Sequence, residues 1–266
     1  MLAIFGTTRW KRQTTHEIEL LSPRIESNHA RVPRYDRSII AALPAPVVRY
    51  FDFALTQGQP MVASACIGWK GNFSMRPHQW SAFTATQHYW VQPPGFVWDA
   101  CIRMASVLPV LVRDSYTDHR GALRAAIGGI VKVADAGGTA DLTKGELLRY
   151  LGEAVWFPTA LLPTAGVTWT ALDESSATAT LSDGATTVSL DAHFGESGEI
   201  VSIAALRPRE VHGSYVPTPW IARVHGYTRR HGMMVPTTGE VEWQLASGPL
   251  PYWQGRVVSA DYDFAH

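Results

Sequence analysis

The sequence has little cysteine and no long apolar run. Cys66 and Cys101 are its two cysteines, too few for the disulfide framework of a small secreted domain, and they are either reduced core residues or one bridge. No stretch of about 20 apolar residues could span a bilayer, and the opening MLAIFGTTRWKRQ has too short an apolar run for a signal peptide. We therefore expect a cytoplasmic protein without a transmembrane segment.

Neither sign of charge predominates. The 23 basic and 23 acidic side chains cancel, so the chain lacks the positive excess that binds a nucleic-acid backbone or an anionic membrane, and we expect no nucleic-acid partner. Charged residues make up 17% and hydrophobic residues 46% of the chain. That composition can build a packed core, and it excludes an intrinsically disordered chain.

Motifs that bind metals and cofactors are missing too. The ten histidines form no HExxH motif and the two cysteines lie far apart, so we expect no metal site. The sequence has no GxGxxG that opens a helix and no GxxxxGKS or GxxxxGKT, which argues against a dinucleotide or phosphate cofactor. The GxSxG motif of serine hydrolases is absent as well. We expect no cofactor.

Aromatic residues and a period of two stand out instead. The chain contains ten Trp, nine Tyr and nine Phe, residue types that are favoured both in strands and in pockets for flat apolar ligands. In FVWDACIRM, Phe96 and Trp98 project to one face of a strand, whereas Val97 and Asp99 project to the other. Together with SAFTATQHYWV and PVLVRDSY, this segment predicts a meander. Residues 121–138 fit either a strand with a glycine bulge or a poor helix.

The remaining segments predict the architecture. After residue 163, short strand-like runs are separated by turns such as DGA and GESGE, which are typical of hairpins. In LPAPVVRYFDFAL, Pro46 suits the first turn of a short packing helix. Residues 1–35 show no clear period, so we expect an irregular N-terminal arm before a single half-barrel domain over 36–266. The predicted fold class is mainly β (α+β): a strongly curved antiparallel sheet or half-open β barrel with a central helix against its concave face.

Residues 141–163 predict that central helix. Thr143 and Glu146 have the spacing of a capping box, so the helix is expected to start near Thr143. Leucine and alanine then recur at three- and four-residue spacing along one face. Pro158 forbids a regular continuation, so the helix should end near Trp156.

The polar stripe of this helix has two interpretations. In one, Glu146 caps the helix, and Arg149 and Glu153 form a solvated ion pair. In the other, the stripe faces a cavity inside the sheet, where a partly dehydrated carboxylate can bind a polar group or move a proton. Glu153 is then the acid/base candidate, and Trp156 and Phe157 form an apolar wall beside it.

A resemblance to a known protein family indicates how far the predicted sheet closes into a barrel. The segments FTATQHYWVQPPGFVWDA, GELLRYLGEAVWFPTALLP, LPAPVVRY, PVLVRDSY and PYWQGRV resemble a bacterial family of unknown function, from about Leu43 to Tyr262. That family is similar in fold to the LolA/LolB lipoprotein carriers, whose half-open β barrel holds an acyl chain against inner helices. The resemblance implies a half barrel and a hydrophobic ligand, and it supplies no catalytic residues.

The first functional hypothesis is a cofactor-independent acid/base enzyme. It would be a lyase or isomerase, catalysing for example C–C cleavage or elimination, that acts on an aromatic hydrophobic molecule such as a lignin-derived dimer. The candidate catalytic residues are Glu153, Arg149, Tyr150, His88 and Asp99. The candidate ligand-binding residues are Trp90, Trp98, Tyr116, Trp156, Phe157 and His225.

The alternative hypothesis is a non-catalytic carrier of lipid or another hydrophobic ligand in the same cavity. Asp99 and Asp114 also have a structural interpretation as partners of arginine, and His88 as a surface histidine. Convergence with Glu153 inside a cavity would favour the functional interpretation. The sequence leaves the oligomeric state open, a homodimer included.

Overall fold

The fold comprises three helices and two series of strands in a computed structural model that describes residues 2–21, 33–76, 79–103 and 109–265. The helices are α1 (Leu2–Leu21), α2 (Ala45–Ala54) and α3 (Ala140–Glu153), with 3₁₀ turns at Arg37–Ile40, Ala154–Trp156, Pro158–Leu161 and Pro163–Ala165. The first series is β1 (Val62–Arg76), β2 (Gln79–Trp90), β3 (Gly95–Ile102), β4 (Val110–Thr117), β5 (Arg120–Ile127) and β6 (Val131–Gly137). The second series is β7 (Val167–Ala171), β8 (Ser176–Asp183), β9 (Thr186–Phe194), β10 (Ile200–Val211), β11 (Ser214–His225), β12 (Thr228–Arg230), β13 (Met233–Val235), β14 (Thr238–Leu245) and β15 (Gly248–Phe264).

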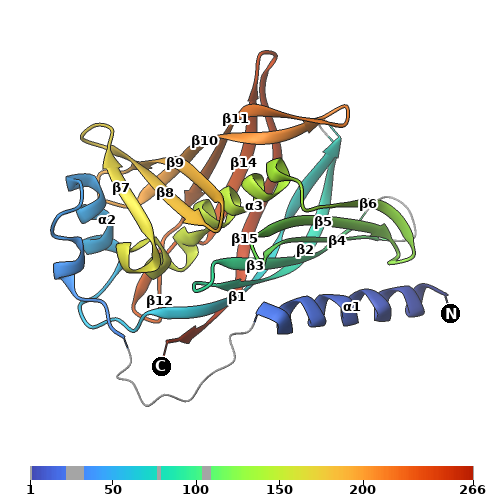
Figure 1. Ribbon diagram of the computed structural model, residues 1–266, viewed down its shortest axis with the longest axis horizontal. Coiled ribbons are helices and arrows are strands. Elements are labelled where there is room, and N and C mark those ends of the chain that lie inside the picture. The colour runs from blue at the N-terminus through green and yellow to red at the C-terminus, as the bar shows by residue number, and fades with distance from the viewer. Residues whose placement is uncertain (1, 22–32, 77–78, 104–108, 266) are drawn as a thin grey trace.

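Most of these strands form one antiparallel sheet. Within the described residues it has thirteen strands in the order β6-β5-β4-β3-β2-β1-β15-β14-β11-β10-β9-β8-β7, and β12 pairs with β13 separately. The long strand β15 pairs with both β14 and β1 and so joins the two series. The sheet curls around α3 as an open half barrel (Figure 1). The predicted fold class is confirmed.

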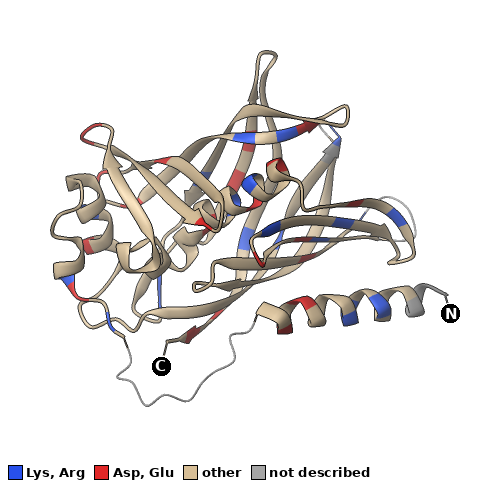
Figure 2. Cartoon of the chain, viewed as in Figure 1, with Lys and Arg blue, Asp and Glu red and all other residues tan. Residues whose placement is uncertain are grey.

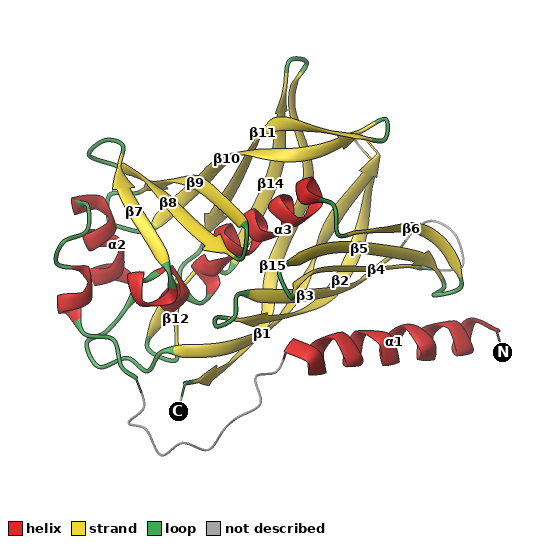
Figure 3. Cartoon of the chain, in the orientation of Figure 1, coloured by secondary structure: helices red, strands yellow, loops and turns green. Residues whose placement is uncertain are grey.

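Helix α3 occupies the concave side because of where it lies in the chain. It connects β6 to β7, the two edge strands of the sheet. It contacts β5 near one edge and β9 and β10 near the other, and it lies inside the curve of the strands (Figure 3). Leu147, Leu148 and Leu151 are fully buried along its apolar face. The connection between the edges therefore fills the opening that the curled sheet leaves.

The start of α3 differs from the sequence prediction. Thr139 is the N-cap, and its Oγ1 accepts a hydrogen bond from the amide of Leu142 at 3.2 Å. Thr143 Oγ1 instead accepts from a β5 amide at 3.2 Å, and Glu146 is buried. The predicted capping box is therefore wrong, because Thr143 holds α3 against the sheet and Glu146 has another role. A 3₁₀ turn extends the helix to Trp156, as predicted.

The N-terminal arm also differs from its prediction, because α1 is a regular helix over Leu2–Leu21. It lies along the convex side of the β1–β6 half of the sheet (Figure 1). The residues that contact the sheet recur at helical spacing: Gly6, Trp10, Thr14, Glu17 and Leu21. This stripe mixes glycine, threonine and glutamate with apolar residues, so it lacks the apolar period that identifies an amphipathic helix.

Residues 121–138 form the hairpin of β5 and β6, which settles the ambiguity in favour of strands. The turn between them contains Gly128 at φ +59° and Gly129 at φ +74°, a conformation that glycine adopts without steric strain. Gly129 also contacts Gly6 of α1, where a Cβ atom would lie 2.7 Å from the Gly6 carbonyl oxygen. The two glycines thus permit a close backbone approach of α1 to the hairpin.

The structure also shows the state of the two cysteines and the character of the helices. Cys66 and Cys101 are free thiols and do not form a bridge. Among the described residues, no helix combines the length and the apolar character needed to cross a bilayer.

Candidate functional site

A cavity of about 190 Å³ lies between α3 and the concave face of the sheet. Two rows of cross-strand neighbours form its walls, because directly paired residues share a face of the sheet. One row runs across β3, β4 and β5 and consists of Trp98, Asp114 and Leu123. The other runs across β10, β11, β14, β15 and β1 and consists of Ile203, Ala222, Val241, Trp253 and Phe73. Strand register therefore assembles the cavity from residues far apart in sequence.

The polar residues that line the cavity are Arg149, Glu153, Asp114, Arg207 and Tyr252, and we call them its polar end. Arg149 belongs to α3. Its Nε donates to Glu153 Oε1 at 2.8 Å and its Nη1 donates to Asp114 Oδ2 at 2.5 Å. The guanidinium also lies over the rings of Phe96, at 4.8 Å, and Trp98, at 5.2 Å. Burial lowers the pKa of Arg149, but the adjacent carboxylates raise it by more, so the side chain stays charged. Arg149 is held by two acids and two aromatic rings at once.

Glu153 is fixed by hydrogen bonds to both of its oxygens. Besides the bond from Arg149, its Oε2 accepts from Gln87 Nε2 at 2.7 Å and from Tyr89 Oη at 3.1 Å. Burial and the negative charge of Glu153 raise the pKa of the Tyr89 hydroxyl, which keeps its proton to donate. The polar stripe of α3 thus faces the cavity and not solvent.

Glu146 lies deeper, beside Arg207 of β10. Its Oε1 accepts from Arg207 Nη2 at 3.1 Å, while its Oε2 is buried without a hydrogen-bond partner. Burial raises the pKa of Glu146 to about 8; Asp114 adds to the rise, and Arg207 and Arg149 oppose it. Burial likewise raises the pKa of Asp114, whose Oδ1 is also buried without a partner. Glu146 therefore carries a proton at neutral pH.

Tyr252 of β15 completes the polar end. Its hydroxyl oxygen accepts from Trp220 Nε1 at 2.8 Å and from Arg207 Nη1 at 3.2 Å. The Arg207 guanidinium lies 5.7 Å from the centre of the Trp220 ring. Burial raises the pKa of Tyr252, so its hydroxyl stays protonated. Figure 2 shows acidic and basic positions on α3 itself.

The sequence profile of a family of unknown function, DUF6920, matches residues 41–262. The chain belongs to this family. The DUF6920 region contains α2, α3, the cavity and nearly the whole sheet, whereas α1 lies outside it. The resemblance predicted for Leu43 to Tyr262 is confirmed.

Solved structures supply two further comparisons with this DUF6920 protein. A LolA superfamily protein from Nitrosomonas europaea matches with a TM-score of 0.34 and 10% identity, over 84% of this chain and 94% of that one. A β-barrel-like protein from Brucella abortus, of the domain of unknown function DUF1849, matches with a TM-score of 0.29 and 9% identity, over 77% and 99% of the two chains. A comparison with curated protein sequences finds no match.

Seven of the predicted site residues lie near α3. Arg149, Glu153, Trp98 and Trp156 line the cavity. Tyr116, Tyr150 and Phe157 are buried beside it: Tyr116 Oη donates to Asp183 at 2.6 Å, and Phe157 packs against Tyr150 with 5.9 Å between the ring centres. These three side chains support the helix and do not line the cavity.

The other four predicted residues lie on the convex side of the sheet, and their predicted grouping with Glu153 is wrong. His88 stacks on Trp90, with 6.1 Å between the ring centres, and Trp90 packs under α1. Asp99 accepts a hydrogen bond from Trp10 Nε1 of α1 at 2.8 Å. His225 borders a separate groove of about 350 Å³ on the outer surface. Alternate residues of a strand point to opposite faces, so these side chains cannot join the cavity residues on their own strands.

Sequence reasoning missed several residues of the polar end: Gln87, Tyr89, Arg207, Trp220 and Tyr252. Strand alternation places Gln87 and Tyr89 on one face of β2, but it does not show that this face meets Glu153. Nothing local connects Arg207 with Glu146, since the two residues meet only when β10 packs on α3. Asp114 does pair with an arginine, Arg149 of α3, which lies far from it in the sequence.

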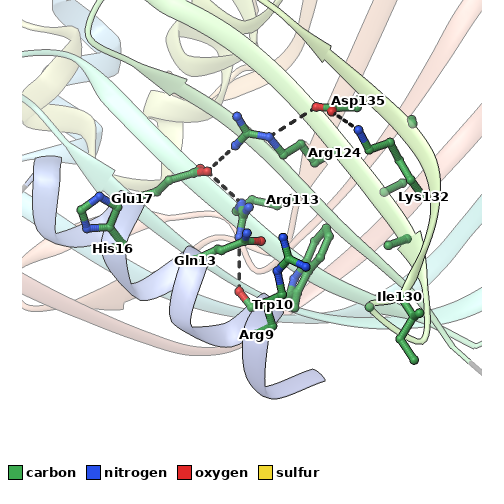
Figure 4. Close-up of a pocket in the computed structure, with 14 residues that line it drawn as sticks. Arg9, Trp10, Gln13, His16, Glu17, Arg113, Arg124, Ile130, Lys132 and Asp135 are labelled. Atoms are coloured by element: carbon green, nitrogen blue, oxygen red, sulfur yellow. Dashed lines mark hydrogen bonds and ion pairs between the residues drawn. The ribbon is translucent and has the colours of Figure 1, made fainter. Parts of the chain in front are cut away.

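A second hollow, of about 470 Å³, lies under α1 (Figure 4). Glu17 of α1 pairs with Arg113, at 3.2 Å, and with Arg124, which also pairs with Asp135 at 3.5 Å. Arg113 lies over the Trp10 ring at 4.8 Å. This alternation of charges fastens α1 to the sheet. Across the described residues there is no cluster of three or more His, Cys, Asp or Glu side chains that could hold a metal ion.

Proposed function

We propose that the protein binds a small hydrophobic molecule in the cavity between α3 and the sheet, as a carrier that performs no chemistry on it. The observation that carries this proposal is the lining of the cavity. Apart from its polar end, the cavity is bordered by aromatic and aliphatic side chains, including Trp156, Trp220, Trp253, Val241 and Ile203. Apolar cavities with a few polar groups at one end are the usual form of small-molecule sites.

The test is mass spectrometry of gently purified protein under native conditions, followed by extraction and identification of any bound compound. A carrier should retain a stoichiometric hydrophobic ligand. The same ligand, added back, should change the fluorescence of the tryptophans that line the cavity.

A cavity-filling variant supplies the control. Ala222 faces the cavity between Ile203 and Val241, so Ala222→Phe should abolish ligand retention. Ala171→Phe makes the same change at an exposed position of β7 and should retain the ligand as the wild type does. Retention that Ala222→Phe leaves unchanged would place the ligand elsewhere and refute the proposal.

A second candidate function is cofactor-independent acid/base catalysis, as a lyase or isomerase on an aromatic molecule. The observation that favours it is the pair of carboxyl groups, Asp114 and Glu146, beside Arg149, each with one buried oxygen that has no hydrogen-bond partner; burial raises the pKa of both. Acid and base groups with different protonation states in one site are typical of such enzymes. Asp114 suits the base better than Glu153 does, because both oxygens of Glu153 already accept hydrogen bonds.

Turnover of a panel of lignin-derived aromatic dimers, followed by liquid chromatography, tests this second candidate. Catalysis should be lost in Asp114→Asn and largely kept in Glu153→Gln. Absence of turnover across the panel, with a ligand retained unchanged, would leave the carrier.

A further inference from the structure

We propose that the ligand of the α3 cavity carries a neutral hydroxyl group on a body about the size of one aromatic ring, as a small phenol or alcohol does. This inference rests on the proposed function, binding of a hydrophobic molecule in that cavity. It concerns which chemical class of hydrophobic molecule binds there.

A carboxylate ligand is disfavoured, because the cations of the cavity are already neutralised. Arg149 pairs with Asp114 and Glu153, and Arg207 pairs with Glu146. Because Glu146 carries a proton, the carboxylates of Asp114 and Glu153 balance the two guanidinium groups, so an added anion would meet no net positive charge. Burying an unpaired charge in an apolar cavity is strongly unfavourable. Fatty acids and aromatic acids are therefore poor ligands.

Outside the two guanidinium groups, the lining leaves one acceptor, Asp114 Oδ1, and two donors, Trp98 Nε1 and the hydroxyl proton of Tyr252, without a hydrogen-bond partner. Asp114 Oδ1 is buried and accepts no hydrogen bond. The Tyr252 oxygen already accepts two hydrogen bonds, from Trp220 and Arg207, so its own proton is left to donate, and no described residue accepts it. Both residues line the cavity. A hydroxyl group both donates and accepts, so it can satisfy either atom, whereas a hydrocarbon leaves both unsatisfied.

The volume limits the size of the ligand. The cavity measures about 190 Å³, and apolar cavities of about 150 Å³ are known to bind benzene. One aromatic ring with a short substituent therefore fits the enclosed space. Trp98, Trp156 and Trp253 supply flat apolar walls against which such a ring can pack.

The test is isothermal titration calorimetry of the full-length protein with three ligands of the same shape: 4-methylphenol, toluene and 4-methylbenzoate, at neutral pH. We expect 4-methylphenol to bind about tenfold more tightly than either of the others, because a site with unpaired polar groups rejects an analogue that lacks the hydroxyl. Tyr252→Phe should reduce the preference for 4-methylphenol over toluene to about threefold or less. Tyr215→Phe, the same change at a β11 tyrosine that does not line the cavity, should keep the full preference.

Each outcome has one interpretation. Equal binding of 4-methylbenzoate or of toluene would overturn the inference and leave the proposed hydrophobic site standing. Binding of 4-methylphenol that Tyr252→Phe and Asp114→Asn both leave unchanged would also overturn it. Binding of none of the three ligands would overturn the inference, whereas the proposed function is decided separately by ligand retention in native mass spectrometry and its loss in Ala222→Phe. A preference for 4-methylphenol that Ala222→Phe removes would support both.

Discussion

Replacing Glu146 by glutamine should change how the stability of the protein depends on pH. Burial raises the pKa of Glu146 from 4.5 to about 8. The folded protein therefore keeps a proton that the unfolded chain has already released. The stabilisation from this group is fully present below about pH 4.5 and is lost as the pH rises toward 8.

The change in the free energy of unfolding with pH can be calculated from the one proton that Glu146 binds in the folded protein. A difference of one bound proton changes the free energy of unfolding by at most about 1.4 kcal/mol per pH unit. Between about pH 6.5 and 7.5 the wild type should therefore lose about 1 kcal/mol through Glu146. Burial lowers the pKa of His88 from 6.5, which has the opposite effect on the pH dependence, but this contribution is common to the wild type and the variant and cancels in their difference. Glutamine keeps an oxygen acceptor for Arg207 and does not titrate.

The assay is urea unfolding followed by tryptophan fluorescence at a series of pH values. Glu146→Gln should flatten the decline in the free energy of unfolding by about 1 kcal/mol between about pH 6.5 and 7.5. Glu196→Gln, at an exposed turn, serves as the matched control and should keep the wild-type slope. If Glu146→Gln declines as steeply as the wild type, Glu146 is ionised in the folded protein and the reasoning about its burial is refuted.

Two glycine substitutions test close backbone approaches. In Gly6→Ala the new Cβ would lie 2.7 Å from the carbonyl oxygen of Gly128. Amide hydrogen exchange should therefore accelerate in α1 and remain slow in the central sheet. If the amides of α1 stay as protected from exchange as in the wild type, α1 does not dock through Gly6. In Gly71→Ala the Cβ would lie 1.9 Å from the carbonyl oxygen of Gln254 on β15. Urea unfolding should show a loss of about 1–3 kcal/mol, whereas Gly137→Ala, with no neighbour nearer than 3.6 Å, should lose less than Gly71→Ala.

The sequence by itself determined the class of fold and the central helix. The period of two in residues 96–102 placed Trp98 and Asp99 on opposite faces of their strand, as the structure has them. Leucine spacing identified the buried side of α3, since apolar residues at helical spacing must face a core. These properties depend on neighbours within a few residues, so a local pattern contains them.

Only the tertiary structure decided which polar side chains meet. Glu146 has the spacing of a capping residue, yet packing of β10 against α3 gives it Arg207 as a partner. Alternation showed that His88 and Gln87 point in opposite directions but not which of them faces α3, because both faces of β2 are covered, one by α3 and the other by α1. Register across the sheet and the return of α3 between its edges are relations between distant segments, and no local pattern in the sequence records them.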